Sequence, residues 1–309
     1  MKLPFPDRRF RLGTRSSPLA MRQTEMTRDA LCAAHGWPQT AVELVPVVAS
    51  GDKILDRPLA DVGGKALWTR ELDAWLAEGR TDASVHSMKD VETIRPTLFV
   101  VAAMLPRADG RDRLIGAESI DALPPGATVG TSSPRRSAQL LRLRPDLKLV
   151  LLRGNVGTRL AKIANGDADA TLLAAAGLDR LGMADTGVAI AFETMLPAPS
   201  QGAVGIEVLA ENAHVRALIS AINHESTCRC VEAERELLAE LGADCRSPVA
   251  ALATVEPGGA LRMRAQLLAM DGSDAVSDDV LIGGEMTPAA LARRLLDAAP
   301  APIRALFAG

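Results

Sequence analysis

The feature of this sequence that most constrains the fold is a regular alternation of short apolar segments with longer amphipathic ones. Strands are predicted over residues 9–15 (RFRLGTR) and 41–50, with a helix over 16–36 between them. That helix has Pro18 near its first position and Gly36 at its end, which are typical helix boundaries. Strands that alternate with helices favour mostly parallel, doubly wound sheets.

The alternation continues along most of the chain. After an aperiodic stretch over 51–64, we expect a helix over 65–79 and strands over 82–88 and 97–105. Further strands are predicted over 127–132, 148–153, 169–174, 187–195 and 202–209, with helices over 133–145, 155–166, 175–183 and 212–241. The phrases LGTRSSPLAMRQ and VGTSSPRRSAQ resemble each other, which suggests two sister domains.

The last part of the sequence has a different character. Three strand-like segments follow Cys245, and a helix is predicted from Thr287. We therefore predict an α/β fold with two doubly wound domains and a small α+β C-terminal domain. The expected boundaries are 1–105 with 201–221 for the first domain, 106–200 for the second and 222–309 for the third.

Composition excludes several classes of protein. The formal net charge is −3 and aromatic residues make up only 3%, so neither a basic field nor a stacking surface for nucleic acid is expected. No Sec-type leader and no apolar run of membrane length is visible, so we expect a cytoplasmic protein without a membrane partner. Cys32, Cys228, Cys230 and Cys245 show no zinc spacing with the histidines, so no metal and a reducing compartment are expected.

Arg135 and Arg136 stand where a strand becomes a helix, with Ser133 as the expected cap and Pro134 after it. Cations at a helix N-terminus are unfavourable by a few tenths of a kcal/mol. They are either two solvated side chains or part of a site in which a bound anion offsets this cost.

Other arginines occupy similar corners, which favours a site for a polyanion. Arg15 ends one predicted strand, Arg153 ends another, and Arg159 lies in the following helix. Ligands of open α/β sheets bind at the carboxyl ends of the strands, and the planar guanidinium pairs well with carboxylate or phosphate. We expect the arginines to face a cleft between the two sister domains.

One carboxylate lies among these cations. The segment DASVHSMKDVE places His86, Lys89 and Asp90 just past a strand end. A surface Lys–Asp pair is the simpler interpretation, but in a cationic cleft Asp90 would stay ionised and could stabilise a developing positive charge. His86 is expected to be a hydrogen-bonded structural residue, since it lies inside the strand.

Two further features are less specific. DVGGKALW is not a phosphate loop, because Ala66 follows the lysine where Ser or Thr is required. Nothing in the residues alone distinguishes Cys245 from Cys228 or Cys230, although Arg246 would lower the pKa of Cys245 if it were close.

Seven phrases together make the sequence resemble the porphobilinogen deaminase family over nearly its whole length. They are GTRSSPLA, GDKILDRPLADVGGKALWTRELD, DASVHSMKDV, VGTSSPRRSAQL, LRGNVGTRLAKI, AAAGLDRLG and QGAVGIE. The resemblance implies a transferase that joins four porphobilinogen molecules head to tail into hydroxymethylbilane with release of ammonia. It also implies two domains similar to type II periplasmic binding proteins, a monomer, and a dipyrromethane cofactor bound covalently to Cys245.

The resemblance also assigns expected roles to residues. Asp90 would be catalytic, and Lys65 and Trp68 would belong to a lid. The expected cofactor-binding and substrate-binding residues are Arg15, Ser17, Lys89, Thr131, Ser133, Arg135, Arg136, Arg153, Asn155, Arg159, Arg180 and Gln201. The chain departs from the family pattern at Ala66, Trp68, Ser200, Ala243, Asp244 and Ser247.

Two alternatives remain at this stage. A non-catalytic small-anion receptor of the periplasmic-binding type would explain two α/β domains and an arginine cleft. It would not explain the third domain, the cysteine loop or Asp90. A phosphate-handling enzyme is disfavoured, because the chain lacks a phosphate loop and a metal cluster.

Overall fold

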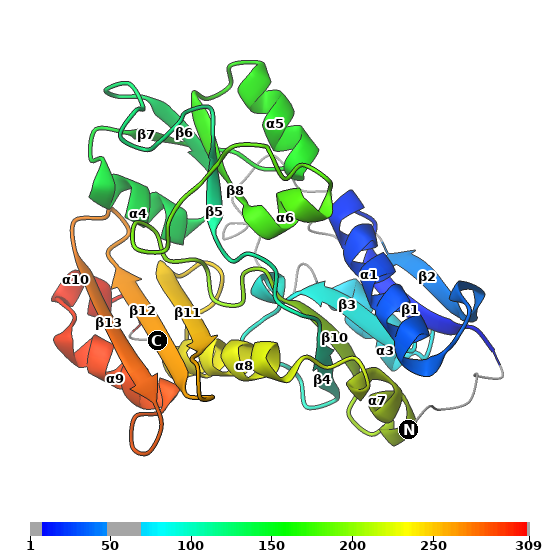
Figure 1. Cartoon of the computed structure of the whole chain (residues 1–309). Coiled ribbons are helices and arrows are strands. Elements are labelled where there is room, and N and C mark those ends of the chain that lie inside the picture. The colour runs from blue at the N-terminus through cyan, green and yellow to red at the C-terminus, as the bar shows by residue number, and fades with distance from the viewer. Residues whose placement is uncertain (1–7, 48–68, 308–309) are drawn as a thin grey trace. The chain divides into compact units, whose positions relative to one another are not determined.

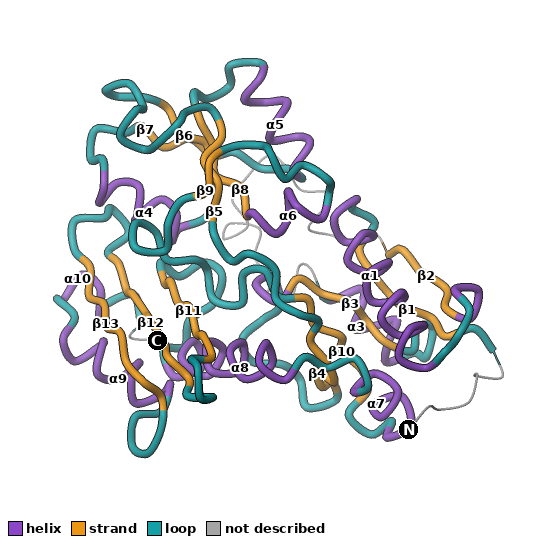
Figure 2. The backbone as a smooth tube through the Cα atoms, in the orientation of Figure 1, coloured by secondary structure: helices purple, strands orange, loops and turns teal. Residues whose placement is uncertain are grey.

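A computed structural model describes residues 8–47 and 69–307. The chain packs as two compact units, one formed by Met1–Ala108 with Ala203–Cys228 and the other by Asp109–Gly202 with Arg229–Gly309. The segments between β4 and β5 and between β9 and β10, where the chain passes from one unit to the other, are loop throughout (Figure 2). The expected lid residues Lys65 and Trp68 lie outside the described residues.

The first unit contains a five-stranded sheet with the order β2-β1-β3-β10-β4 (Figure 1). Its strands are β1 (Phe10–Arg15), β2 (Val42–Val47), β3 (Ala83–Ser87), β4 (Phe99–Met104) and β10 (Val204–Leu209). β1 is parallel to β2 and β3, whereas β10 is antiparallel to β3 and β4. Its helical elements are α1 (Pro18–His35), η1 (Gln39–Ala41), α3 (Arg70–Ala77), η3 (Met88–Asp90) and α7 (Ala213–Ser220).

The second unit repeats this plan in a sheet with the order β7-β6-β8-β5-β9. Its strands are β5 (Asp112–Ile115), β6 (Thr128–Thr131), β7 (Lys148–Leu151), β8 (Ala170–Ala174) and β9 (Val188–Ala189). β6 is parallel to β7 and β8, and β5 is antiparallel to β8 and β9. The helices that alternate with these strands are α4 (Pro134–Leu143), α5 (Val156–Ala164) and α6 (Ala175–Arg180).

A separate antiparallel sheet completes the second unit, with the order β11-β12-β13. The elements of this part are β11 (Val249–Val255), β12 (Leu261–Leu268), β13 (Ala275–Ile282), α9 (Pro288–Ala298) and α10 (Ala301–Arg304). α9 packs on β12 and β13, and its Leu291 joins Leu237 and Met263 in a core of their own. α8 (Glu225–Glu240) begins in the first unit and continues into the second.

The helix starts follow from local chemistry that the sequence displays. The hydroxyls of Ser17, Ser133 and Thr287 accept the backbone N–H three residues ahead, and a proline follows each of them. Serine and threonine at this position satisfy N–H groups that the helix leaves unpaired. α1 ends at Gly36, whose φ of 72° lies in the left-handed region that glycine adopts without strain.

The predicted fold class is confirmed, with three corrections to the elements. The segment 112–115 was not predicted as a strand but forms β5, the antiparallel member of its sheet. The predicted strand 187–195 pairs only over Val188–Ala189. The predicted helix 212–241 is interrupted at 221–224, between α7 and α8. The division into three domains stays a prediction, since the structure separates the chain into two units.

Candidate functional site

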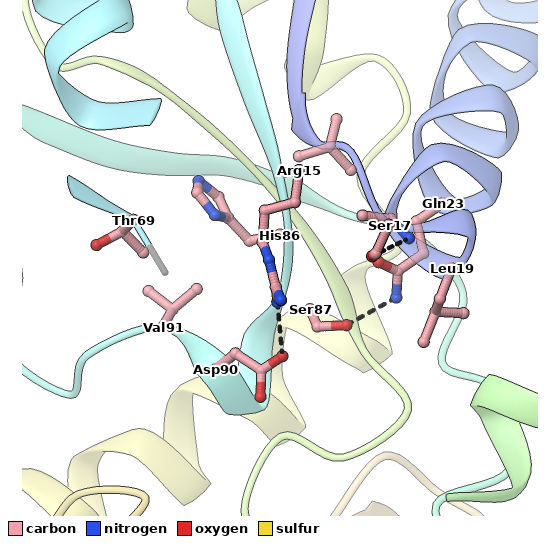
Figure 3. A pocket seen from close by; sticks show the side chains of 11 residues that line it. Arg15, Ser17, Leu19, Gln23, Thr69, His86, Ser87, Asp90 and Val91 are labelled. Atoms are coloured by element: carbon pink, nitrogen blue, oxygen red, sulfur yellow. Dashed lines mark hydrogen bonds and ion pairs between the residues drawn. The ribbon is translucent and has the colours of Figure 1, made fainter. Parts of the chain in front are cut away.

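The first candidate site is a pocket at the edge where parallel strands β1 and β3 end. Arg15 is the last residue of β1, and Ser17 caps α1 with its Oγ 3.3 Å from the Ala20 nitrogen. Figure 3 shows Arg15, Ser17 and Asp90 around this pocket, which we call the Asp90 pocket. Its lining residues are Arg15, Ser17, Leu19, Ala20, Gln23, Thr69, Val85, His86, Ser87, Asp90 and Val91.

The backbone after β3 places Asp90 in this pocket. The Met88 N–H donates to the carbonyl of Ala203, and the Met88 side chain is 1% exposed. This hydrogen bond and the buried side chain fix the position of the turn η3. Asp90 Oδ2 lies 3.8 Å from Arg15 Nη1, and the Asp90 side chain keeps 37% exposure. The structure thus joins a cation and an accessible carboxylate that stand far apart in the sequence, in agreement with the carboxyl-edge rule.

His86 lies next to the buried carboxylate of Glu207. Its Nε2 lies 3.4 Å from Oε2 of Glu207, and both side chains are at most 5% exposed. Arg95 donates two hydrogen bonds to Glu207, at 2.9 and 2.7 Å. Burial alone would raise the pKa of Glu207, but the adjacent His86 ring and the hydrogen bonds from Arg95 outweigh it and lower the pKa to about 2.

The same arginine links this pair to the start of α3. Arg95 Nη2 donates to Asp73 at 2.6 Å, and its Nη1 donates to Glu92 at 2.8 Å. The hydroxyl of Thr69, which lines the Asp90 pocket, donates to Glu92. Sequence reasoning missed this network, because its members are brought together by strand pairing and not by any local motif.

The second candidate site is the carboxyl edge of β6, β7 and β8 in the second unit. Because these strands are parallel, the residues that follow them share one edge. Most of the remaining predicted binding residues end or follow these three strands, namely Thr131, Ser133, Arg135, Arg136, Arg153, Asn155, Arg159 and Arg180. We call this set the arginine edge. Their contact with a ligand stays a prediction.

Local geometry explains the second corner of the arginine edge. Asn155 caps α5 by accepting the Thr158 N–H at 2.9 Å, and Arg159 Nε donates to the carbonyl of Gly154 at 3.0 Å. Gly154 has a φ of 121°, and a Cβ there would lie 2.7 Å from the Thr158 side chain. The corner therefore requires glycine, and it holds Arg159 against the backbone.

Arg135 and Arg136 are buried, and a protein carboxylate already lies between them. Arg135 Nη2 donates to Asp112 at 2.8 Å and Arg136 Nη2 donates to the same carboxylate at 2.6 Å. Burial alone would raise the pKa of Asp112, but the two arginine charges hold it well below its usual range. The sequence suggested that Arg135 and Arg136 are either solvated or bound to an anionic ligand. Neither interpretation included Asp112, an anion within the protein itself.

Gln201 and Arg180 donate hydrogen bonds to protein groups. Gln201 is 0% exposed, and its amide donates to Asp112 and to the Gly110 carbonyl, both at 2.8 Å. Arg180 Nη2 donates to the Gly202 carbonyl at 2.7 Å, and burial lowers its pKa. Gln201 therefore helps to position the carboxylate of Asp112 that pairs with Arg135 and Arg136.

Cys245 lies on an exposed turn between α8 and β11. The turn is closed by the Ser247 N–H, which donates to the carbonyl of Asp244, and by the Asp244 N–H, which donates to Ser247 Oγ. The Asp244 carboxylate lies 2.6 Å from Arg246, and this hydrogen bond raises the pKa of Arg246. Two residues at which the chain departs from the family pattern thus build the turn that carries the cysteine.

Comparison with known proteins identifies the family. The model of the porphobilinogen deaminase dipyromethane cofactor binding domain matches residues 10–217, and that of the porphobilinogen deaminase C-terminal domain matches residues 228–298. The chain belongs to the porphobilinogen deaminase family. The resemblance seen in the sequence phrases is confirmed, and the deaminase family accounts for both matched regions.

Two bacterial relatives support this assignment. Porphobilinogen deaminase of Sphingopyxis alaskensis is 58% identical over 99% of both chains. The Paracoccus denitrificans protein of the same name is 46% identical over 89% of both. The second substrate-binding domain of Lactococcus lactis GlnP, in an open conformation, is 13% identical, covers 72% of this chain and 89% of its own, and has a TM-score of 0.44.

The residues present fit a dipyrromethane cofactor. This group carries four carboxylates on two pyrrole rings, and the arginine edge offers five guanidiniums, those of Arg135, Arg136, Arg153, Arg159 and Arg180. Nε of Arg135, Arg136 and Arg180 is buried and has no hydrogen-bond partner among the described residues. The described residues contain no cluster that could hold a metal and no helix long and apolar enough to cross a bilayer.

Proposed function

We propose that Asp90 is the catalytic carboxylate with which this chain, a porphobilinogen deaminase, joins porphobilinogen molecules head to tail. Four molecules are joined into hydroxymethylbilane, with release of ammonia at each step, on a dipyrromethane cofactor. The observation that carries the site assignment is the accessible carboxylate of Asp90, 3.8 Å from Arg15 at the carboxyl edge of its sheet.

The proposed chemistry needs one fixed negative charge. The C–N bond of the protonated aminomethyl group breaks, ammonia leaves with the bonding electrons, and an electron-poor methylene remains conjugated to the substrate pyrrole. The Asp90 carboxylate stabilises this positive charge and can accept a hydrogen bond from the pyrrole N–H. The methylene then forms a C–C bond with the free carbon of another pyrrole, which loses its proton.

The cofactor, when bound, supplies the pyrrole to which the first substrate molecule is joined. We propose that Cys245 anchors it, which agrees with the exposure of this side chain on its turn. The guanidiniums of the arginine edge are proposed to hold acetate and propionate groups, with Thr131, Ser133 and Asn155 shaping the corners. Arg15, Ser17 and Lys89 are proposed to hold the substrate at the Asp90 pocket.

Incubation of the purified protein with porphobilinogen tests the function. Ammonia and a linear tetrapyrrole should appear in a ratio of four to one. A non-catalytic anion receptor would bind porphobilinogen and release neither product. Ehrlich's reagent gives a second distinction, because a chain that carries dipyrromethane should develop colour before any substrate is added.

The assembly state and cellular location are also proposals. We propose a monomer in the cytoplasm, and the free thiols of Cys32, Cys228, Cys230 and Cys245 agree with a reducing compartment. Light scattering coupled to gel filtration would measure the mass in solution, and a mass of twice 32.5 kDa would contradict the monomer.

A further inference from the structure

Asp112 occupies a special position in the second unit. It opens β5, and its backbone is in register with Ala174 at the end of β8. Because β5 runs antiparallel to β8, the start of β5 lies at the same edge as the ends of β6, β7 and β8. The first residue of β5 therefore places its carboxylate at the arginine edge. The Asp112 carboxylate is 1% exposed.

Both oxygens of this carboxylate are used. Oδ2 accepts from Arg135, whereas Oδ1 accepts from Arg136 and from the amide of Gln201. Two guanidiniums share one carboxylate, so the three charged side chains together retain one positive charge. In a buried setting such charges interact strongly, because little water screens them.

The two arginines have other anchors besides Asp112. Arg135 Nη1 donates to the Leu196 carbonyl and to Gln139, and Arg136 Nη1 donates to the Leu172 carbonyl. Their Nε groups have no hydrogen-bond partner among the described residues. Loss of Asp112 would therefore leave both guanidiniums tethered in place, with two positive charges where one remained.

We propose that Asp112 is the internal counterion of Arg135 and Arg136, and that it sets how strongly this site holds the carboxylates of dipyrromethane and of the growing chain. Asp112 cancels one of the two charges before any ligand arrives. Asp112 thereby stabilises the site in the absence of a ligand and limits the affinity of the two arginines for pyrrole carboxylates. This inference rests on the proposed function, and Asp112 acts through the arginines as a positioning residue.

A cycle of four proteins tests the proposal: wild type, Asp112→Asn, Cys245→Ser and the double variant. The quantity is the drop in Tm on loss of the cofactor, with cofactor content checked by intact mass. In Asp112→Asn the cofactor carboxylates offset the charges of both Arg135 and Arg136. The drop in Tm from Asp112→Asn to the double variant should therefore exceed the drop from wild type to Cys245→Ser by at least about 3 °C. A purely structural role lowers all Tm values alike, so equal drops, or a smaller drop, would overturn the proposal.

Asp109→Asn is the matched control. Asp109 lies on the same segment, but its ion-pair partner among the described residues is Arg111, at 2.7 Å, and not Arg135 or Arg136. Its cofactor-dependent drop in Tm should equal that of wild type. If Asp109→Asn enlarged the drop as much as Asp112→Asn, the effect would be general electrostatics and the proposal would fail.

The holoenzyme offers a second measurement if the double variant does not fold. With an extra positive charge, Asp112→Asn should have a lower KM for porphobilinogen at low salt and a steeper rise of KM with NaCl. An unchanged KM and salt slope would contradict the proposal. The proposed function fails separately, since a wild-type protein without turnover and without the cofactor mass would refute it whatever Asp112 does.

Discussion

Arg15 Nη1 and Asp90 Oδ2 lie 3.8 Å apart at the point where β1 and β3 end at one edge of their sheet. This separation allows electrostatic attraction without a close hydrogen bond, so the carboxylate keeps lone pairs for a substrate. Arg15 also keeps a cation beside the position where porphobilinogen carboxylates are proposed to bind. The pairing arises from the parallel topology of β1 and β3, because 75 residues separate the two positions in the sequence.

Asp90→Asn should abolish most turnover. The amide has nearly the shape of the carboxylate but no negative charge, so the developing cation loses its stabilisation. We expect the rate of ammonia release to fall by at least about 10²-fold, as for other single electrostatic groups in active sites, with cofactor content unchanged. Asp29→Asn, on the exposed face of α1, should retain the wild-type rate. Near-normal turnover of Asp90→Asn would refute the assignment.

Arg153→Lys and Arg159→Lys should cause partly extended chains to accumulate. Lysine keeps the charge but loses the planar fork that holds a carboxylate by two hydrogen bonds. Different arginines are expected to serve different stages, since each added pyrrole brings two more carboxylates. Native mass spectrometry during turnover measures the intermediates, with exposed Arg142→Lys as control. A uniform loss of activity without accumulated intermediates would contradict staged binding.

Glu207→Gln should change how stability depends on pH. The pKa of Glu207 falls from an ordinary 4.5 to about 2 in the folded chain, so its contribution is complete above about pH 4.5 and is lost as the pH falls toward 2. Glu207→Gln has no such contribution to lose, so its Tm should fall less steeply between pH 6 and 3. Exposed Glu211→Gln should follow the wild-type slope. Identical slopes for Glu207→Gln and wild type would contradict the lowered pKa.

Ser200→Gly should stabilise the protein slightly. Ser200 has a φ of 66° and is 1% exposed, while its N–H donates to the buried carboxylate of Glu234. A left-handed residue with a Cβ costs about 1–2 kcal/mol, and the greater freedom of glycine in the unfolded chain offsets part of this gain. We expect Tm to rise by about 1–2 °C. Ser137→Gly, inside α4, should lower Tm instead, and a fall for both would contradict strain at Ser200.

The sequence was informative where structure depends on local chemistry. The capped corners at Ser17 and Ser133 and the alternation of strands and helices were predictable, because caps, prolines and apolar periodicity act over a few residues. β5 was not, since its four residues include two charges and its identity as a strand depends on pairing with β8. Asp112 and Glu207 were missed for the same reason.

The resemblance supplied other parts of the site that local chemistry could not. Cys245 has no distinguishing spacing, and its exposed turn depends on Asp244 and Ser247, which depart from the family pattern. The pairing of Arg135 and Arg136 with Asp112 also shows why a cation at a helix start is not by itself evidence of a ligand. An internal carboxylate can offset the same cost, and only long-range strand pairing reveals it.

The most direct test of the account is the intact mass of the purified chain under denaturing conditions. The account predicts the mass of 309 residues plus one covalently bound dipyrromethane, with peptide mapping placing the adduct on Cys245. Cys245→Ser should have the unmodified mass, no turnover and a lower Tm, because the cofactor carboxylates no longer offset the arginine edge. An active wild-type chain of unmodified mass, or an adduct on Cys228 or Cys230, would contradict it.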